Sequence, residues 1–235
     1  MSTQRPSIRR SAAAVGALLA AALVLLSTIR SSATEPPNAL LPTTVEVPLS
    51  LRTTPFDEDR VLMVPPGFEI SVLARIPMVR FIMPLSTGDF LVAQPAFGTI
   101  SLVQVQADGT ATVFSLIEDL QNPQGMALYR SDDKLYLYVG ESNQVSRFLI
   151  TPGGASAGEK TVIVPNLPES SSPELRGSYR HELKNLVIGP DNKLYVDIAS
   201  STNADPIDTT GDPVRSAIYQ YDLDGKNGRI FARDP

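Results

Sequence analysis

A unit of short apolar runs recurs along the chain, and this repeat restricts the possible fold more than any other feature. Residues 126–150, "MALYRSDDKLYLYVGESNQVSRFLI", match residues 186–201, "LVIGPDNKLYVDIASS", which are followed after an insertion by "AIYQYDLDG" at 217–225. The Leu-Tyr pairs at 135–136 and 194–195 lie 59 residues apart. Residues 86–109 hold a fainter copy in the same order. The repeat therefore predicts three similar structural units.

The runs within each unit have the composition of β-strands. They are rich in β-branched and aromatic residues and are broken by Gly, Pro, Asp and Asn, with no convincing helix between them. Three related units of four-stranded size are typical of the blades of a β-propeller. We therefore expect an all-β fold, an incomplete β-propeller of about three four-stranded blades, because closed propellers typically have about 4 to 8. A β-sandwich with similar meanders is the alternative.

The N-terminus has the pattern of a secretory signal peptide. Arg5, Arg9 and Arg10 precede an apolar stretch at 11–29, and small residues follow at Ser31 and Ala33. We expect residues 1–33 to be a signal peptide cut after Ala33, so that the protein is exported to the periplasm or secreted. The alternative is an uncleaved hydrophobic helix that anchors the chain in the membrane, since about 20 apolar residues span a bilayer.

The remainder divides into a linker and a domain. Residues 34–60 are proline-rich without a sustained period, which predicts a tether or a strand-like wrap, and residues 61–235 hold the partial propeller. The 235-residue chain is 43% hydrophobic, enough for a real core. Its net charge of −5 gives no basic stripe for nucleic acid, and the absence of cysteine removes disulfides, thiolate metal sites and cysteine nucleophiles.

Three short motifs resemble metal sites without completing them. "HELKN" at 181–185 begins like a zinc helix but has no second histidine. "DLDGKNG" at 222–228 begins like a calcium loop, but its glycine falls too early, so we interpret it as a hairpin turn. Asp205, Asp208 and Asp212 could collect a cation, although Asp-Pro turns explain the same residues. We therefore predict no metal ligand within this sequence.

Several segments resemble, in the same order, those of the glucose/sorbosone dehydrogenases. They are "VPPGFEISVLA", "QNPQGMAL", "LYLYVGESNQVSRF", "LRGSYRHELKNLVIGPDNKLYVDIASSTN", "DPVRSAIYQYDLDG" and "GRIFAR", and the resemblance covers roughly residues 65–232. The resemblance implies a six-bladed propeller that binds pyrroloquinoline quinone (PQQ) and calcium. It also implies that this chain stops after about three blades.

The resemblance places a catalytic base on His181, the single histidine of the chain. In that family the matching histidine takes a proton from the anomeric hydroxyl of a sugar while a hydride passes to the quinone. Imidazole suits this role because its ordinary pKa is about 6.5. The alternative is an ordinary loop histidine. The resemblance implies substrate contacts for Gln121, Arg180 and Asn203.

Two departures from the family affect the expected substrate and cofactor. Ala199 and Ser200 stand where the glucose-oxidising branch has Gly-Asp, so "ASSTN" is nearer to the sorbosone branch. The family's quinone contacts would follow Pro235, so no cofactor-binding residue is assigned here. PQQ is a tricarboxylate that needs cationic partners, and we therefore expect this chain to bind it poorly.

Two functions follow as hypotheses. The first is an exported quinoprotein oxidoreductase that oxidises an aldose or a sugar aldehyde with PQQ, impaired by truncation, with an unknown electron acceptor. The second is a non-catalytic propeller fragment that serves as a binding or scaffold module. A propeller lactonase is a third possibility, but it would need a channel-facing acidic calcium site that the sequence does not provide.

Overall fold

The computed structural model describes residues 39–169, 184–201 and 206–233. Its contacts divide the chain into two units, Met1–Val45 with Arg60–Ile70, and Glu46–Asp59 with Ser71–Pro235. The expected signal peptide and N-terminal hydrophobic helix lie outside the described residues. No helix within the described residues is long and apolar enough to cross a bilayer.

The described part of the first unit is a two-stranded antiparallel hairpin. Strand β1 (Leu41–Thr44) pairs with β2 (Val61–Val64). The backbone N–H of Val45 extends this pairing with a 2.8 Å hydrogen bond to the carbonyl of Arg60. Val45 and Arg60, the two ends of the segment that joins β1 to β2, are therefore hydrogen-bonded to each other.

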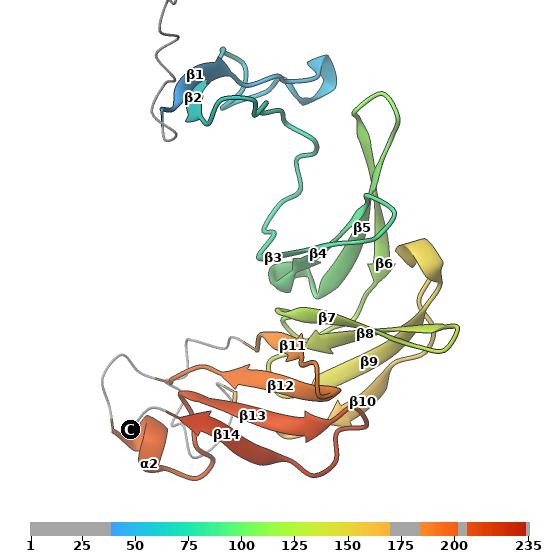
Figure 1. The fold of residues 1–235 in the computed structure, drawn as a ribbon, viewed down its shortest axis with the longest axis vertical. Coiled ribbons are helices and arrows are strands. Elements are labelled where there is room, and N and C mark those ends of the chain that lie inside the picture. Colours follow the sequence, from blue (N-terminus) through green and yellow to red (C-terminus); the bar gives the residue numbers. More distant parts are fainter. Residues whose placement is uncertain (1–38, 170–183, 202–205, 234–235) are drawn as a thin grey trace, which may run out of the picture. The chain divides into compact units, whose positions relative to one another are not determined.

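The second unit contains three four-stranded antiparallel sheets, each formed by consecutive strands. Figure 1 shows the middle sheet between the other two. The first sheet comprises β3 (Phe81–Pro84), β4 (Phe90–Gln94), β5 (Thr99–Val105) and β6 (Ala111–Ile117). The second comprises β7 (Met126–Ser131), β8 (Lys134–Gly140), β9 (Val145–Ile150) and β10 (Thr161–Val164). The third comprises β11 (Leu186–Ile188), β12 (Lys193–Ile198), β13 (Ala217–Asp222) and β14 (Arg229–Arg233).

Within the described residues, helical structure is confined to single turns. The described residues contain the 3₁₀ segments η1 (Leu49–Leu51), η2 (Pro95–Phe97) and η3 (Pro152–Gly154), and the short helix α2 (Ile207–Thr210). The all-β propeller fold with blades of four strands is therefore confirmed, and the sandwich alternative is not what the chain forms. The 59-residue repeat corresponds to strands β8 and β12, the second strand of successive sheets.

Two hydrophobic clusters hold the sheets face to face. One joins Leu91 and Leu102 of the first sheet to Leu137 of the second, and the other joins Tyr138 of the second sheet to Val196 of the third. Because successive side chains of a strand point to opposite faces, adjacent residues 137 and 138 of β8 enter different clusters. The middle sheet is thus buried on both faces, as in stacked propeller blades.

The first strands of the three sheets are neighbours. Strand β7 contacts β3 on one side and β11 on the other. In a propeller the first strand of each blade lies nearest the axis, and this arrangement places the connections between blades around the same end. The fold therefore brings together the described parts of the loops that follow β6, β8, β10 and β12.

The apolar run at 68–74 has the alternating composition of a strand but does not form one. The run "FEISVLA" at 68–74 makes only an isolated parallel bridge, between Ser71 and Glu46, with a 2.8 Å hydrogen bond from the N–H of Val72 to the carbonyl of Glu46. An alternating apolar pattern indicates a strand only where a neighbouring strand supplies hydrogen bonds. Within the described residues this segment has no sheet to join.

The hairpin interpretation of "DLDGKNG" is confirmed. Its turn joins β13 to β14, with hydrogen bonds from the N–H of Gly225 to the carbonyl of Asp222 and from the N–H of Asp222 to the carbonyl of Lys226. The side chain of Asn227 donates to the Asp222 carboxylate at 2.6 Å. Asp222 is therefore a turn residue whose carboxylate is engaged within the protein.

Candidate functional site

The loops at one end of the stacked sheets are tied to one another by backbone hydrogen bonds. The N–H of Ser142, after β8, donates to the carbonyl of Gln121, after β6, at 2.9 Å. The N–H of Gly125 donates to the carbonyl of Lys184 at 3.1 Å, and the N–H of Leu167 donates to the carbonyl of Asn143 at 2.7 Å. These bonds tie together the connections after β6, β8 and β10. With the connection after β12, which lies at the same end of the sheets, they form a surface that we call the loop face.

Two glycines allow the second and third sheets to approach at this face. A Cβ atom on Gly140 would lie 2.2 Å from the carbonyl oxygen of Lys184, and one on Gly125 would lie 2.6 Å from the Cα of Asn185. Any larger residue would push the two backbones apart. These positions therefore fix the spacing between the loop after β8 and the segment that leads into β11.

Gln121 is the one candidate substrate contact that the described residues include, and it lies on the loop face. Its backbone N–H donates to Glu141 Oε2 at 2.8 Å, and its side-chain Nε2 lies 3.2 Å from Glu169 Oε2. The backbone is thereby fixed on both sides, while the exposed amide reaches toward the loop after β10. This position is compatible with contact to a polar ligand.

The buried carboxylate of Glu141 holds this part of the loop face in place. Its side chain is 0% exposed and pairs with Lys160, whose Nζ lies 2.9 Å from Oε2. Gln144 Nε2 and Ser146 Oγ donate to the other carboxylate oxygen, at 2.8 and 2.5 Å. Buried carboxylates are stable only when their oxygens are paired in this way. The network therefore holds the loops after β6 and β8 in one arrangement.

A second buried ionic group lies in the connection after β12. Arg215 Nε lies 2.8 Å from Asp208 Oδ1, and both side chains are almost fully buried. The backbone N–H and the hydroxyl of Ser201 donate to the same oxygen. Asp208 is thus held by an arginine, which does not favour the cation site considered for Asp205, Asp208 and Asp212. Asp205 lies outside the described residues.

Lys184 and Asp197 lie near each other, just before β11 and close to the end of β12. Lys184 is 0% exposed, three residues after the expected catalytic position. Burial raises the pKa of the Asp197 carboxyl above its ordinary value, while a hydrogen bond from Asn185 and the charge of Lys184 act in the opposite direction. A half-buried acid beside a fully buried cation is the kind of environment that occurs at functional sites.

Three of the predicted site residues lie outside the described residues. They are the expected base His181 and the expected substrate contacts Arg180 and Asn203. The described segment that lies between His181 and Asn203 begins at Lys184 and ends at Ser201. Both of these end residues are on the loop face. The roles of the three predicted residues therefore stay predictions, and Gln121 is the predicted site residue that the structure places.

Sequence reasoning missed Glu141, Lys184 and the Asp208–Arg215 pair. A weak signal existed for Glu141, because it follows directly on the apolar run "LYLYVG", where a charged residue marks the end of a buried strand. The two other groups carried no such signal, because their burial depends on contacts between distant segments.

The described cations of the loop face do not fit a tricarboxylate cofactor. Lys160 and Arg215 are paired with carboxylates of the protein, and Lys184 is buried. Among the described residues there is also no group of three His, Cys, Asp or Glu side chains that could hold a metal ion. PQQ or calcium would therefore need contacts from outside this set.

The fold defines the chain as a propeller protein, and comparison with known proteins specifies which propellers it is similar to. No family model matches the sequence, and no curated protein matches it. Among solved structures, the holo PQQ domain of a pyranose dehydrogenase from Coprinopsis cinerea aligns with a TM-score of 0.58 and 18% identity, over 70% of this chain and 41% of that one.

Two structures of a family AA12 carbohydrate-active enzyme from Trichoderma reesei give similar results. The iodide structure aligns at a TM-score of 0.52 with 21% identity, over 65% of this chain and 38% of that one. The calcium structure aligns at 0.51 with 22% identity, over 68% and 38%. The resemblance to PQQ sugar dehydrogenases is thus confirmed as a resemblance of fold. The chain spans about two fifths of the length of these structures.

Proposed function

We propose that this chain is part of an exported sugar oxidoreductase of the quinoprotein class, which oxidises an aldose or a sugar aldehyde. The observation that carries the proposal is the position of Gln121 and of the segment beginning at Lys184 on one loop face of a propeller stack. In propellers, ligands bind where such loops surround the axis. The sequence order of the family motifs supports the same class.

His181 is the base in this proposal. A neutral imidazole with an ordinary pKa of about 6.5 can accept the proton of a sugar hydroxyl near neutral pH. The amide of Gln121, the guanidinium of Arg180 and the amide of Asn203 supply hydrogen bonds that orient the sugar. Arg180, in the position that precedes the base, favours a substrate other than glucose.

PQQ is the hydride acceptor that this class uses, and calcium accompanies it. We assign no cofactor contact to the described residues, because their cations on the loop face are already engaged or buried. Efficient activity therefore depends on groups outside the described residues. The chain carries the base and part of the substrate pocket.

The alternative is a non-catalytic propeller fragment that serves as a binding or scaffold module. One observation favours it. Each of two carboxylates of the loop face is neutralised by its own cation, Glu141 by Lys160 and Asp208 by Arg215. Such internal pairing supports a stable surface for binding and leaves few charges for chemistry.

Dye-linked oxidation separates the two functions. The purified chain is supplied with excess PQQ and calcium and tested with a panel of aldoses and sugar aldehydes. We expect slow dye reduction that depends on PQQ and disappears in His181→Ala. Lys226→Ala, a change in the β13–β14 turn, is the matched control and should retain the rate. No reduction with any substrate would favour the scaffold function, and activity that persists in His181→Ala would remove the base assignment.

A further inference from the structure

The second strands of the first two sheets both end at a buried polar side chain. Gln94 is the last residue of β4, and Glu141 directly follows β8. Their positions are equivalent, because the serines that donate to them, Ser101 on β5 and Ser146 on β9, have the same register in the two sheets. We call Gln94 and Glu141 the strand-end residues, and each of them binds the segment that leads into its own sheet.

The strand-end residue of the first sheet is a neutral amide that both donates and accepts. Gln94 Nε2 donates to the carbonyl of Pro77, before β3, at 2.9 Å. Its Oε1 accepts a hydrogen bond from Ser101 Oγ at 2.8 Å. Glutamine can do both because its side chain carries an NH₂ group and a carbonyl oxygen. It therefore suits an entering segment that presents a carbonyl.

The strand-end residue of the second sheet is a carboxylate surrounded by donors. The backbone N–H of Gln121, before β7, donates to Glu141 Oε2 at 2.8 Å. Three side chains also donate to this carboxylate, those of Lys160, Gln144 and Ser146. An ionised carboxylate only accepts, whereas a glutamine at the same place would turn its NH₂ group toward two of these donors. A carboxylate therefore suits an entering segment that presents an N–H.

The backbone of Gln121 is held on one side by Glu141 and on the other by Ser142. The N–H of Ser142 donates to the carbonyl of Gln121 at 2.9 Å. The side chain of Gln121 stays exposed, with Nε2 3.2 Å from Glu169 Oε2. The direction in which the Gln121 amide leaves the loop therefore depends on the Glu141 carboxylate.

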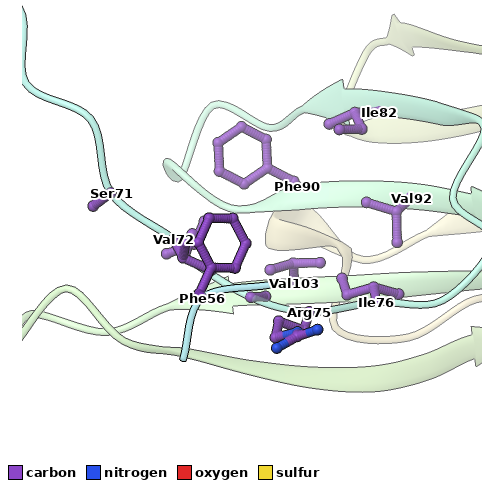
Figure 2. Close-up of a pocket in the computed structure, with 11 residues that line it drawn as sticks. Phe56, Ser71, Val72, Arg75, Ile76, Ile82, Phe90, Val92 and Val103 are labelled. Carbon is purple, nitrogen blue, oxygen red and sulfur yellow. The ribbon is translucent and has the colours of Figure 1, made fainter. Parts of the chain in front are cut away.

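A groove in front of the first sheet is less suited to a sugar than the loop face. Figure 2 shows its apolar lining, which includes Phe56 and Val92, and its volume is about 420 Å³. The guanidinium of Arg75 also lines this groove, but it donates to the backbone carbonyls of Thr53 and Thr54. Hydroxyl groups need hydrogen-bond partners when a protein removes them from water. Within the described residues, the polar loop face supplies such partners and the groove is mainly apolar.

We propose that Glu141 is a positioning residue for sugar recognition, because its carboxylate holds the Gln121 backbone so that the Gln121 amide meets the sugar in one orientation. This inference rests on the proposed function, in which Gln121 contacts the sugar. Glu141 is completely buried and acts through Gln121, so it touches neither the sugar nor the reacting atoms. A hydrogen bond needs a correctly placed donor and acceptor, and a pre-formed placement lowers the cost of binding.

The kinetic test compares variants of the two strand-end residues in the dye-linked assay with excess PQQ and calcium. Glu141→Met should raise KM for the best sugar about tenfold and leave kcat within about twofold, because it weakens binding without changing the chemical step. Lys160 is partly exposed, so its ammonium group can reach water once the carboxylate is gone. Gln94→Met is the matched control, since it removes the equivalent contact of the first sheet and should leave KM unchanged.

A double variant separates positioning from general destabilisation. Gln121→Ala removes the amide and should raise KM by a similar factor. Addition of Glu141→Met to Gln121→Ala should have no further effect on KM, because no amide is left to position. A purely structural role of Glu141 would lower activity in both backgrounds.

Circular dichroism verifies that each variant is folded. If Glu141→Met does not fold, Glu141→Gln takes its place, because it keeps one acceptor oxygen while it removes the charge. Glu141→Gln should raise KM by a smaller factor than Glu141→Met.

Amide hydrogen exchange, measured by NMR, tests the same contact without an activity assay. The Gln121 N–H should exchange about tenfold faster in Glu141→Met than in wild type, because its acceptor is lost. The N–H of Leu120 is the internal control, since it donates to the carbonyl of Gly98 at 3.0 Å. The exchange rate of Leu120 should stay the same.

Three kinetic results would overturn the proposal if the wild type is active. They are an unchanged KM in Glu141→Met, an equal rise of KM in Gln94→Met, and an additive effect in the double variant. Unchanged exchange of the Gln121 N–H would overturn it whatever the activity. A wild type that oxidises no sugar would contradict the proposed function itself, and the role in sugar recognition would be lost with it.

Discussion

Glu141 and Lys160 form an ion pair across the second sheet, with Nζ 2.9 Å from Oε2 and the carboxylate completely buried. Removal of one partner from a buried pair typically costs about 3–5 kcal/mol, because the remaining charge has no partner. Lys160 is partly exposed to water, whereas Glu141 is not. The larger loss of stability is therefore expected when Lys160 is removed and the Glu141 carboxylate stays buried without a counter-charge. The pair connects the outer strand of the second sheet to the loop that carries Gln121.

We predict that Lys160→Met lowers the free energy of unfolding by about 3 kcal/mol, because it leaves the buried Glu141 carboxylate unpaired. Urea unfolding at pH 7 measures the change. The control is Lys226→Met, which removes an exposed partner of Asp224 and should alter the free energy of unfolding by less than about 0.5 kcal/mol. Equal effects of the two variants would mean that the buried pair contributes little.

Gly140→Ala should destabilise the chain by about 1–3 kcal/mol, because its Cβ would meet the carbonyl oxygen of Lys184 at 2.2 Å and force the second and third sheets apart. Gly158→Ala is the matched control, since its nearest neighbour, the carbonyl oxygen of Leu149, lies at 3.4 Å. Thermal unfolding followed by circular dichroism compares the two. A neutral Gly140→Ala variant would show that the two sheets are not in close contact at this point.

The pH dependence of stability should include a contribution from Asp197. Burial raises the pKa of this carboxyl in the folded state, so folding favours its protonated form. Stability from this group is present below the unfolded-state pKa of about 3.9 and is lost as pH rises through the higher folded pKa. Asp197→Asn should therefore be more stable than wild type at pH 7, and the difference should shrink below about pH 4. If the stability difference between Asp197→Asn and wild type grew toward acid pH, the pKa of Asp197 would be shifted in the opposite direction.

Titration with PQQ should give weak binding without a stoichiometric end point. The cofactor needs cationic partners, and Lys160, Lys184 and Arg215 are paired or buried. Fluorescence quenching with and without calcium measures the affinity. A tight one-to-one complex would show that this chain holds a complete cofactor pocket.

The stack of sheets followed from the sequence because its signals are local and repeated. Alternating apolar residues and turns defined the strands, and the 59-residue period aligned β8 with β12. The run at 68–74 has the same alternation and still forms only an isolated bridge. Alternation records which face a residue would occupy in a sheet, whereas strand formation also requires a partner that the run itself does not specify.

The candidate site was less accessible to sequence reasoning. Gln121 could be selected from the family motif, and the structure places it on the loop face. The burial of Glu141 and Lys184 could not be predicted, because it arises where three connections meet and depends on the approach that Gly125 and Gly140 permit. Contacts of this kind join residues far apart in the sequence and leave no periodic signal.

The central claim is that the lone imidazole belongs to the same loop face as Gln121. A crystal structure of the chain that includes residues 170–183 tests it most directly. We predict that the ring of His181 lies on the face where the connections after β6, β8 and β10 meet, within reach of a sugar that also contacts the Gln121 amide. An imidazole at the opposite end of the sheets, or on the outer edge beyond β10 and β14, would contradict it.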